Sequence, residues 1–278
     1  MVNLAELRAR WTHLARVYRC YLWIYGRRLA TNRADTAMAV LVGLVSQASG
    51  LLMLIVLVQR LPHLAGWDFP ELLFIYAFAR SGIALAAIFL DSPYTVDGTI
   101  HTGALDILLL RPVGSLFQVI GRAQQPNNIS TSLTSLGLLG YSIAHMTIVW
   151  GPGRFFWLMV MTLAAMVIRF GMLMLVATVC FRTKFHAVLL LVGQATGYMV
   201  YPMEIFAPPL RAFLTFVVPL ALTSYYPAAF ILRPGSFAWV PWVCISAAIG
   251  FTVACRAAWR WGLRHYESSG GLAAVWDG

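Results

Sequence analysis

The sequence predicts an all-α polytopic membrane protein with six transmembrane helices, and three observations favour this class. Of the 278 residues, 60% are hydrophobic and only 11% are charged, whereas a soluble domain usually holds about 25% charged residues. Apolar stretches of about 20 residues, the length needed to cross the hydrocarbon core of a bilayer, recur along the chain. Aromatic residues reach 13%, which is typical of a protein with an aromatic belt at each membrane interface.

Residues 1–35 are predicted to form an amphipathic helix that lies along the membrane surface. Three arginines, Arg8, Arg16 and Arg19, fall between apolar residues that recur at steps of three or four. This spacing places the apolar side chains on one helix face and turns the arginines toward lipid phosphates or a soluble partner. The apolar positions are Leu4, Leu7, Trp11, Leu14, Val17, Tyr18, Tyr21 and Leu22.

A transmembrane domain is predicted over residues 36–260, with a cytoplasmic tail at 261–278. Each expected span is close to the ~20 residues that a bilayer requires. The second and third spans leave a sizeable loop between them, at residues 91–128. The six spans are expected at residues 36–59, 70–90, 129–150, 154–181, 185–203 and 236–256.

The distribution of basic residues predicts the orientation of these spans. With the N-terminus inside, the inner segments hold 14 of the 20 basic residues and the outer segments hold four. Positive charge accumulates on the cytoplasmic side of membrane proteins. Both termini and the loop at 91–128 are therefore expected in the cytoplasm, and residues 204–235 are expected outside.

The stretch at residues 201–232, YPMEIFAPPLRAFLTFVVPLALTSYYPAAFIL, is as apolar as a membrane span but carries five prolines. Pro208 can begin a short helix near residues 209–218 and Pro219 ends it, after which a second helix opens near Tyr225. Broken backbone at membrane depth is stable only when it packs in protein or lines a cavity. We therefore expect a re-entrant helical hairpin at residues 204–235, before the last span.

Several functional classes are disfavoured by the sequence. The net charge of +10 does not indicate nucleic-acid binding, because the basic residues lie mostly at span ends and no basic-aromatic soluble module is present. The four cysteines lack C-x-x-C spacing, and none of the six histidines pairs with carboxylates at the spacing of a metal or catalytic site, so neither kind of site is expected. The phosphate-binding pattern G-x-x-x-x-G-K-[ST] is missing, so the chain is not expected to hydrolyse ATP itself.

Two stretches of the sequence resemble a known family. Residues 103–121, GALDILLLRPVGSLFQVIG, are similar to the pattern G-x-[LI]-D-x-L-L-x-[RK]-P-[VL], and residues 201–228 are similar to a proline-rich pattern that ends in Y-P-A. Together with the predicted layout, they resemble the type-2 ABC transporter permeases, the membrane subunits of ATP-driven exporters. The residues that match the first pattern are Gly103, Leu105, Asp106, Leu108, Leu109, Arg111 and Pro112.

This resemblance implies a permease of the bacterial plasma (inner) membrane that exports a hydrophobic or amphipathic substrate, such as a drug, a lipid or a lipid-linked glycan. It also implies a separate ATPase subunit, which carries ATP and Mg²⁺, and a second permease that is identical or homologous. No cofactor is expected on this chain. The alternative is a membrane-embedded enzyme or scaffold without transport, which is disfavoured because the polar residues within the spans do not form an acid–base or nucleophilic set.

The same resemblance assigns residues 103–121 to coupling with the ATPase. The apolar run from Ile107 to Leu110 would fit a groove on that subunit, while Asp106 and Arg111 fix its register. The alternative is a loop that lipid holds on the membrane surface. A substitution on the outer side, such as Arg233→Glu, is expected to leave ATPase association unchanged.

Candidates for the substrate path or gate come from the spans and the hairpin. Arg80 and Arg169 are predicted near mid-span, where an arginine is unfavourable and usually faces a partner or a wet cavity. They attract an anionic headgroup, pair with an acid or a carbonyl, or snorkel to the interface if the span ends are misplaced. The candidates in the hairpin are Glu204, for which simple solvation at the interface is the alternative, Phe206, Phe213, Tyr225 and Tyr226.

A pair of small residues marks the fifth span. Gly193 and Gly197 form a G-x-x-x-G pattern, which lets two helices approach closely. The resemblance implies that the first and fifth spans line a dimer interface, and the alternative is packing within the chain.

Overall fold

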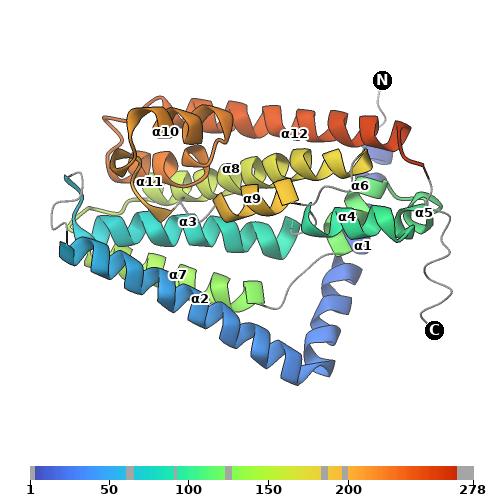
Figure 1. Ribbon diagram of the computed structural model, residues 1–278, viewed down its shortest axis with the longest axis horizontal. Coiled ribbons are helices and arrows are strands. Elements are labelled where there is room, and N and C mark those ends of the chain that lie inside the picture. The colour runs from blue at the N-terminus through green and yellow to red at the C-terminus, as the bar shows by residue number, and fades with distance from the viewer. Residues whose placement is uncertain are drawn as a thin grey trace.

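The computed structural model describes residues 4–60, 66–90, 93–122, 127–182, 187–195 and 200–267. Within these ranges the chain is helical and contains no strand. The longer helices form an elongated bundle, and shorter helices gather at its two ends (Figure 1). The predicted all-α class is therefore confirmed for the part of the chain that is described.

Two helices of equal length open the chain. Helix α1 (Leu4–Thr31) and helix α2 (Arg33–Arg60) are separated at Asn32. Figure 1 shows them as the two arms of a V, with α1 crossing one end of the bundle and α2 running obliquely along its side. A helix that crosses the ends of spanning helices has the orientation expected of a surface-lying amphipathic helix.

Four helices among the described residues are long and apolar enough to cross a membrane. They are α2, α3 (Phe69–Leu90), α8 (Pro152–Ala177) and α12 (Val240–Arg264). The most apolar 18-residue stretches of the α3 and α8 spans are 72% and 61% buried, against 17% in α2 and 22% in α12. Helices α3 and α8 therefore form the centre of the bundle, and α2 and α12 present apolar faces outward.

Helix α7 (Asn127–His145) packs against α2 and α3 but is less apolar than these four helices. Its buried face is rich in serine, and these hydroxyls donate to backbone carbonyls; Ser142, for example, donates to Pro70 at 2.9 Å. The predicted third span at residues 129–150 was placed too far along, because the helix ends at residue 145 and an irregular segment leads to Gly151.

The predicted fifth span at residues 185–203 is described only in part. Helix α9 (Ala187–Ala195) covers most of its first half, while residues 183–186 and 196–199 lie outside the described residues. The presence of six spans therefore remains a prediction, and the structure supports a multi-pass helical protein with four candidate spans.

The last helix, α12, begins later and ends later than the predicted span at residues 236–256. Pro241 lies in its first turn, where proline is tolerated because the backbone N–H has no helical partner there. The helix then continues to Arg264, about two turns beyond residue 256. The arginines from residue 256 onward favoured an earlier end of the span. Trp259 on the same turns, however, is only 3% exposed and anchors the helix to its neighbours.

The proline-rich segment forms short helices at the end of the bundle opposite α1 (Figure 1). Helix α10 (Pro208–Ala212) continues into a π-helical turn (Phe213–Val217), and α11 (Tyr225–Leu232) follows after a break around Pro219. Two short helical pieces thus occur where the prolines predicted them. Whether this hairpin enters the outer leaflet remains a prediction.

Candidate functional site

The predicted coupling loop at residues 91–128 contains three short helices at the α1 end of the bundle (Figure 1). They are α4 (Pro93–His101), α5 (Ala104–Leu109) and α6 (Ser115–Arg122). Residues 91–92 and 123–126 lie outside the described residues. We call residues 103–121 the coupling segment.

Gly103 makes the sharp turn from α4 into α5. Its φ of +71° lies in the left-handed region, which side chains with a Cβ atom rarely adopt. Its carbonyl accepts a hydrogen bond from the Asp106 N–H at 3.1 Å, which starts the helix. The glycine in the family-like pattern thus has a backbone role.

The leucine-rich run in the coupling segment is divided between a buried side and an exposed side. Leu105 and Leu108 are 0% and 1% exposed and anchor α5 to the bundle. Ile107, Leu109 and Leu110 are 58%, 46% and 86% exposed, and we call them the exposed ridge. An apolar ridge on a firmly anchored support is suited to insertion into a groove of another protein.

Two polar residues that the sequence analysis did not identify hold the coupling segment in shape. The Gln118 side-chain amide is buried and donates to the carbonyls of Leu108 at 2.9 Å and Val113 at 2.6 Å, which closes the turn between α5 and α6. The Trp259 indole N–H donates to the Ser115 hydroxyl at 3.2 Å and so ties α6 to α12. The Trp259 contact has no local sequence signal, because Ser115 lies 144 residues away along the chain.

The two charged residues of the pattern have different surroundings. Asp106 is half-buried and lies near Tyr266, just beyond α12. Burial, reinforced by this carboxylate, raises the pKa of Tyr266 to about 12. Arg111 and Pro112 are exposed beside the ridge. Asp106 therefore faces Tyr266 of its own chain, and Arg111 is available to a partner.

Helix α1 packs directly on the coupling segment. The Tyr18 and Phe117 rings lie 6.3 Å apart, and a Cβ atom added at Gly121 would come within 2.6 Å of the Tyr21 ring. Gly121 therefore allows α1 to approach α6 closely. The amphipathic helix and the coupling segment form one continuous surface at this end of the bundle.

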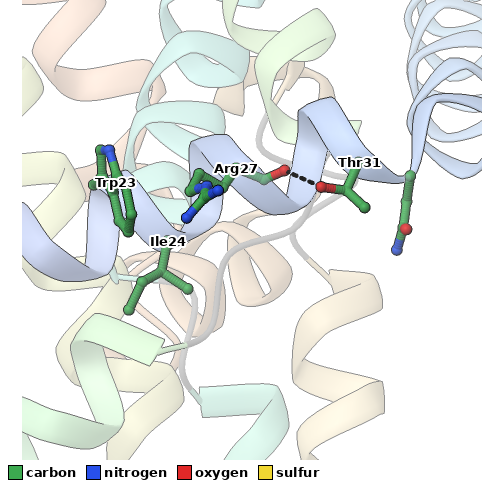
Figure 2. A pocket seen from close by; sticks show the side chains of 5 residues that line it. Trp23, Ile24, Arg27 and Thr31 are labelled. Atoms are coloured by element: carbon green, nitrogen blue, oxygen red, sulfur yellow. Dashed lines mark hydrogen bonds between the residues drawn. The ribbon is translucent and has the colours of Figure 1, made fainter.

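Another stretch of α1 presents a mixed apolar and basic surface near α2. Trp23 and Ile24 are 62% and 56% exposed, and the Arg27 guanidinium lies 4.8 Å from the centre of the Trp23 ring. The Thr31 hydroxyl donates to the Arg27 carbonyl at 2.9 Å, and these side chains line a shallow hollow (Figure 2). Tryptophan and arginine side by side are typical of a membrane interface, where the ring enters the lipid and the guanidinium reaches phosphate.

Arg80, a candidate for the substrate path, contacts α2. Its guanidinium donates to the Gln47 side-chain carbonyl and lies 3.4 Å from the Ser46 hydroxyl. The buried Tyr76 hydroxyl also donates to the Gln47 backbone carbonyl, at 3.2 Å. This network satisfies the arginine between two helices of the same chain, as the structural-pairing alternative predicts.

Arg169, the second mid-span arginine, is 8% exposed on α8. It lines a narrow cavity with Pro93, Tyr94 and Phe170, between α8, the end of α3 and α4. Arg80 faces a different pair of helices, so no shared site unites the two arginines in the described residues. Their role in a substrate path remains a prediction.

Glu204, Tyr225 and Arg211 hold the proline-rich segment together. The buried Tyr225 hydroxyl donates to the Glu204 carboxylate. The Arg211 guanidinium donates to the carbonyls of Met203 at 3.0 Å, Glu204 at 3.3 Å and Phe206 at 3.4 Å. Of the path candidates, Glu204 and Tyr225 are thus joined, and Arg211, which the sequence analysis did not identify, caps the turn before α10.

The aromatic candidates in the hairpin occupy different environments. Phe213 is 47% exposed, and Phe206 is half-buried against the core. The Tyr226 ring lies 5.2 Å from Tyr225 and 5.1 Å from Trp239, which places it in an aromatic cluster at the start of α12. An apolar face with aromatic rings is compatible with an amphipathic substrate.

Gly193 packs within the chain in this structure. A Cβ atom added there would lie 2.7 Å from the Tyr94 hydroxyl oxygen, so the glycine allows α9 to approach α4. Gly197 lies outside the described residues. The dimer role of this pair remains a prediction.

An ion pair that the sequence analysis did not anticipate joins the hairpin to the start of α3. The Arg233 guanidinium lies 2.8 Å from the Glu71 carboxylate and donates to the Gly66 carbonyl at 2.8 Å. It also lies 3.8 Å from the centre of the Trp67 ring. Arg233, whose substitution was expected to have no effect on ATPase association, therefore connects two parts of the fold.

The two ends of the bundle define a class of protein: a polytopic helical membrane protein with a structured, apolar-ridged loop at one end and a proline-broken hairpin at the other. A family model described as an ABC-2 family transporter protein matches residues 44–270. The chain therefore belongs to the ABC-2 family of transporters and is a membrane permease. It has no match among the curated proteins or the solved structures with which it was compared.

Proposed function

We propose that the chain is the permease subunit of an ABC exporter, driven by a separate ATPase that binds the α1 end of the bundle. The observation that carries this proposal is the exposed ridge of Ile107, Leu109 and Leu110 on its buried support. An ATP-driven permease needs a protein contact through which force passes. The ridge and the adjoining surface of α1 have the apolar exposure that such a contact requires.

The α1 end of the bundle is proposed to face the cytoplasm. Helix α1 and the end of α12 lie at the same end of the molecule (Figure 1). This arrangement agrees with an even number of crossings. The excess of arginine on that side supports the cytoplasmic orientation, in a bacterial plasma membrane.

The proposed substrate is hydrophobic or amphipathic, such as a drug, a lipid or a lipid-linked glycan, and it moves out of the cytoplasm or the inner leaflet. The aromatic cluster of the outer hairpin supports this class of cargo. ATP and Mg²⁺ would bind the ATPase. A second permease, identical or homologous, would complete the path, and the outward apolar face of α2 is compatible with such a partner.

The purified chain is expected to show no ATP hydrolysis by itself, because its sequence lacks the phosphate-binding loop. Addition of its cognate ATPase, sought first among genes encoded beside it, is expected to give hydrolysis that the substrate stimulates. The measurement is phosphate release from the reconstituted proteins. Vanadate-sensitive turnover by the isolated permease would contradict this proposal, and an enzyme or scaffold without an ATPase partner would then be favoured.

The orientation is tested by thiol labelling in a cysteine-free background. Glu267→Cys lies in the exposed segment just beyond α12, and Gly235→Cys lies in an exposed turn at the opposite end. An impermeant thiol reagent is expected to label Gly235→Cys in intact cells and Glu267→Cys only after permeabilisation. The reverse pattern would place α1 outside.

A further inference from the structure

A cavity of about 840 Å³ lies where α1, α6, α8 and α12 meet at the α1 end of the bundle. This size is in the range of pockets that hold small molecules. Its wall belongs neither to the exposed ridge nor to the outer hairpin. The apolar residues that form most of it include Leu14, Phe117, Ile120, Val167 and Phe170.

Two hydroxyl groups in this cavity already donate to backbone carbonyls, whereas an arginine could bind an occupant. The Thr252 hydroxyl donates to the Ala248 carbonyl at 2.8 Å, and the Tyr18 hydroxyl donates to the Phe89 carbonyl at 3.4 Å. Among the described residues that line the cavity, Arg256 is the one charged residue, and it is exposed. An apolar cavity beside one cation suits a long hydrocarbon chain that carries an anionic headgroup, and it suits water poorly.

The cavity also lies near the ends of the candidate spans, where a lipid headgroup would lie in a bilayer. Two of its walls, α8 and α12, are candidate membrane spans, and a third wall, α1, crosses their ends. A neighbouring hollow on α1 is lined by the exposed Arg16 and Arg19. Basic residues at this depth attract anionic headgroups.

We propose that this cavity binds an anionic phospholipid, with an acyl chain between α1, α6, α8 and α12 and its phosphate at Arg256. The lipid is a bound component and not cargo. Because α1 and α6 each form part of the wall, the bound lipid stabilises the packing of the coupling segment on the spanning helices. The proposal does not depend on the direction or the substrate of transport.

The test is native mass spectrometry of the purified full-length chain, titrated with phosphatidylglycerol or phosphatidylcholine. The wild type is expected to bind phosphatidylglycerol about fivefold more tightly, the contribution typical of one arginine beside an anionic headgroup. Arg256→Gln is expected to remove this preference. Arg260→Gln, one turn further along α12, exposed and outside the cavity lining, is the matched control and is expected to keep it.

A second variant tests the chain-binding part of the cavity. Ala15→Phe adds a ring to the α1 wall, and it is expected to reduce binding of both phospholipids, whereas Ala30→Phe on an exposed part of the same helix is expected to have no effect. Thermal melting establishes that each variant is folded. Unchanged lipid preference in Arg256→Gln, unchanged binding in Ala15→Phe, or equal competition by glycerol 3-phosphate, which has no acyl chain, would each overturn the proposal.

Discussion

Leu110→Asp is expected to reduce association with the ATPase at least about tenfold while the permease remains folded and abundant. Leu110 is 86% exposed, so its side chain contributes little to the packing of its own chain. Truncation of an apolar anchor in an interface pocket commonly costs about 2 kcal/mol or more, and each ~1.4 kcal/mol is a factor of ten in affinity. A carboxylate at this position would also have to lose its hydration on binding.

The measurement is copurification of the ATPase at equal permease expression, with transport assayed beside it. Leu109→Asp, also on the exposed ridge, is expected to behave in the same way. Arg60→Glu, an exposed charge at the opposite end of the bundle, is expected to leave association unchanged. If both ridge variants retain full association and transport, the ridge is not the coupling contact, and α1 becomes the better candidate.

Leu108→Asp separates loss of the contact from loss of the fold. Leu108 is 1% exposed, and a charge there would be buried in the core beneath α5. Its expected effect is therefore lower abundance of folded permease, because an unpaired buried charge is strongly unfavourable. Ridge variants that also lowered abundance would show that the exposed leucines serve the fold.

The parts of the fold that the sequence predicted best are marked by residues with strong local effects. Arginine or proline lies at or near the ends of α2, α3 and α8. The observed bounds of these helices lie within a few residues of the predicted ones. The proline pattern also located the two helical pieces of the hairpin. In these segments the chain's own backbone chemistry decides where a helix starts or stops.

The features that the sequence could not predict depend on partners far along the chain. Arg80 is satisfied by Gln47, which is 33 residues away on another helix, and no local pattern indicates this pair. In the leucine run of the coupling segment, the division into anchor and ridge depends on how Gln118 and Trp259 hold α5 and α6. The motif therefore marks residues 103–121 as a candidate for coupling, but tertiary packing decides which of their side chains face outward.

Arg233→Glu is expected to lower the melting temperature of the purified permease by about 5–10 °C, and the structure makes it unsuitable as a neutral control. Arg233 lies 2.8 Å from both the Glu71 carboxylate and the Gly66 carbonyl, and its guanidinium stacks on Trp67. The Glu71 side chain is only 15% exposed, so the substitution would place two carboxylates together with little solvent to screen them. Charge-assisted hydrogen bonds contribute about 1.5–3 kcal/mol, and each kcal/mol shifts melting by about 2–4 °C in a chain of this size.

The double variant Glu71→Arg with Arg233→Glu tests whether the charge pair is the cause. It restores the opposite charges but not the stacking of Arg233 on Trp67, so it is expected to recover about half of the lost melting temperature. Trp67 in turn packs edge-on against Tyr225, with ring centres 6.0 Å apart, so this pair connects the start of α3 to the hairpin that holds Glu204. Arg60→Glu, exposed at the same end of the bundle, is expected to melt like the wild type. If Arg233→Glu also melts within about 1 °C of the wild type, the ion pair does not stabilise the hairpin, and the packing of the aromatic rings alone holds it to α3.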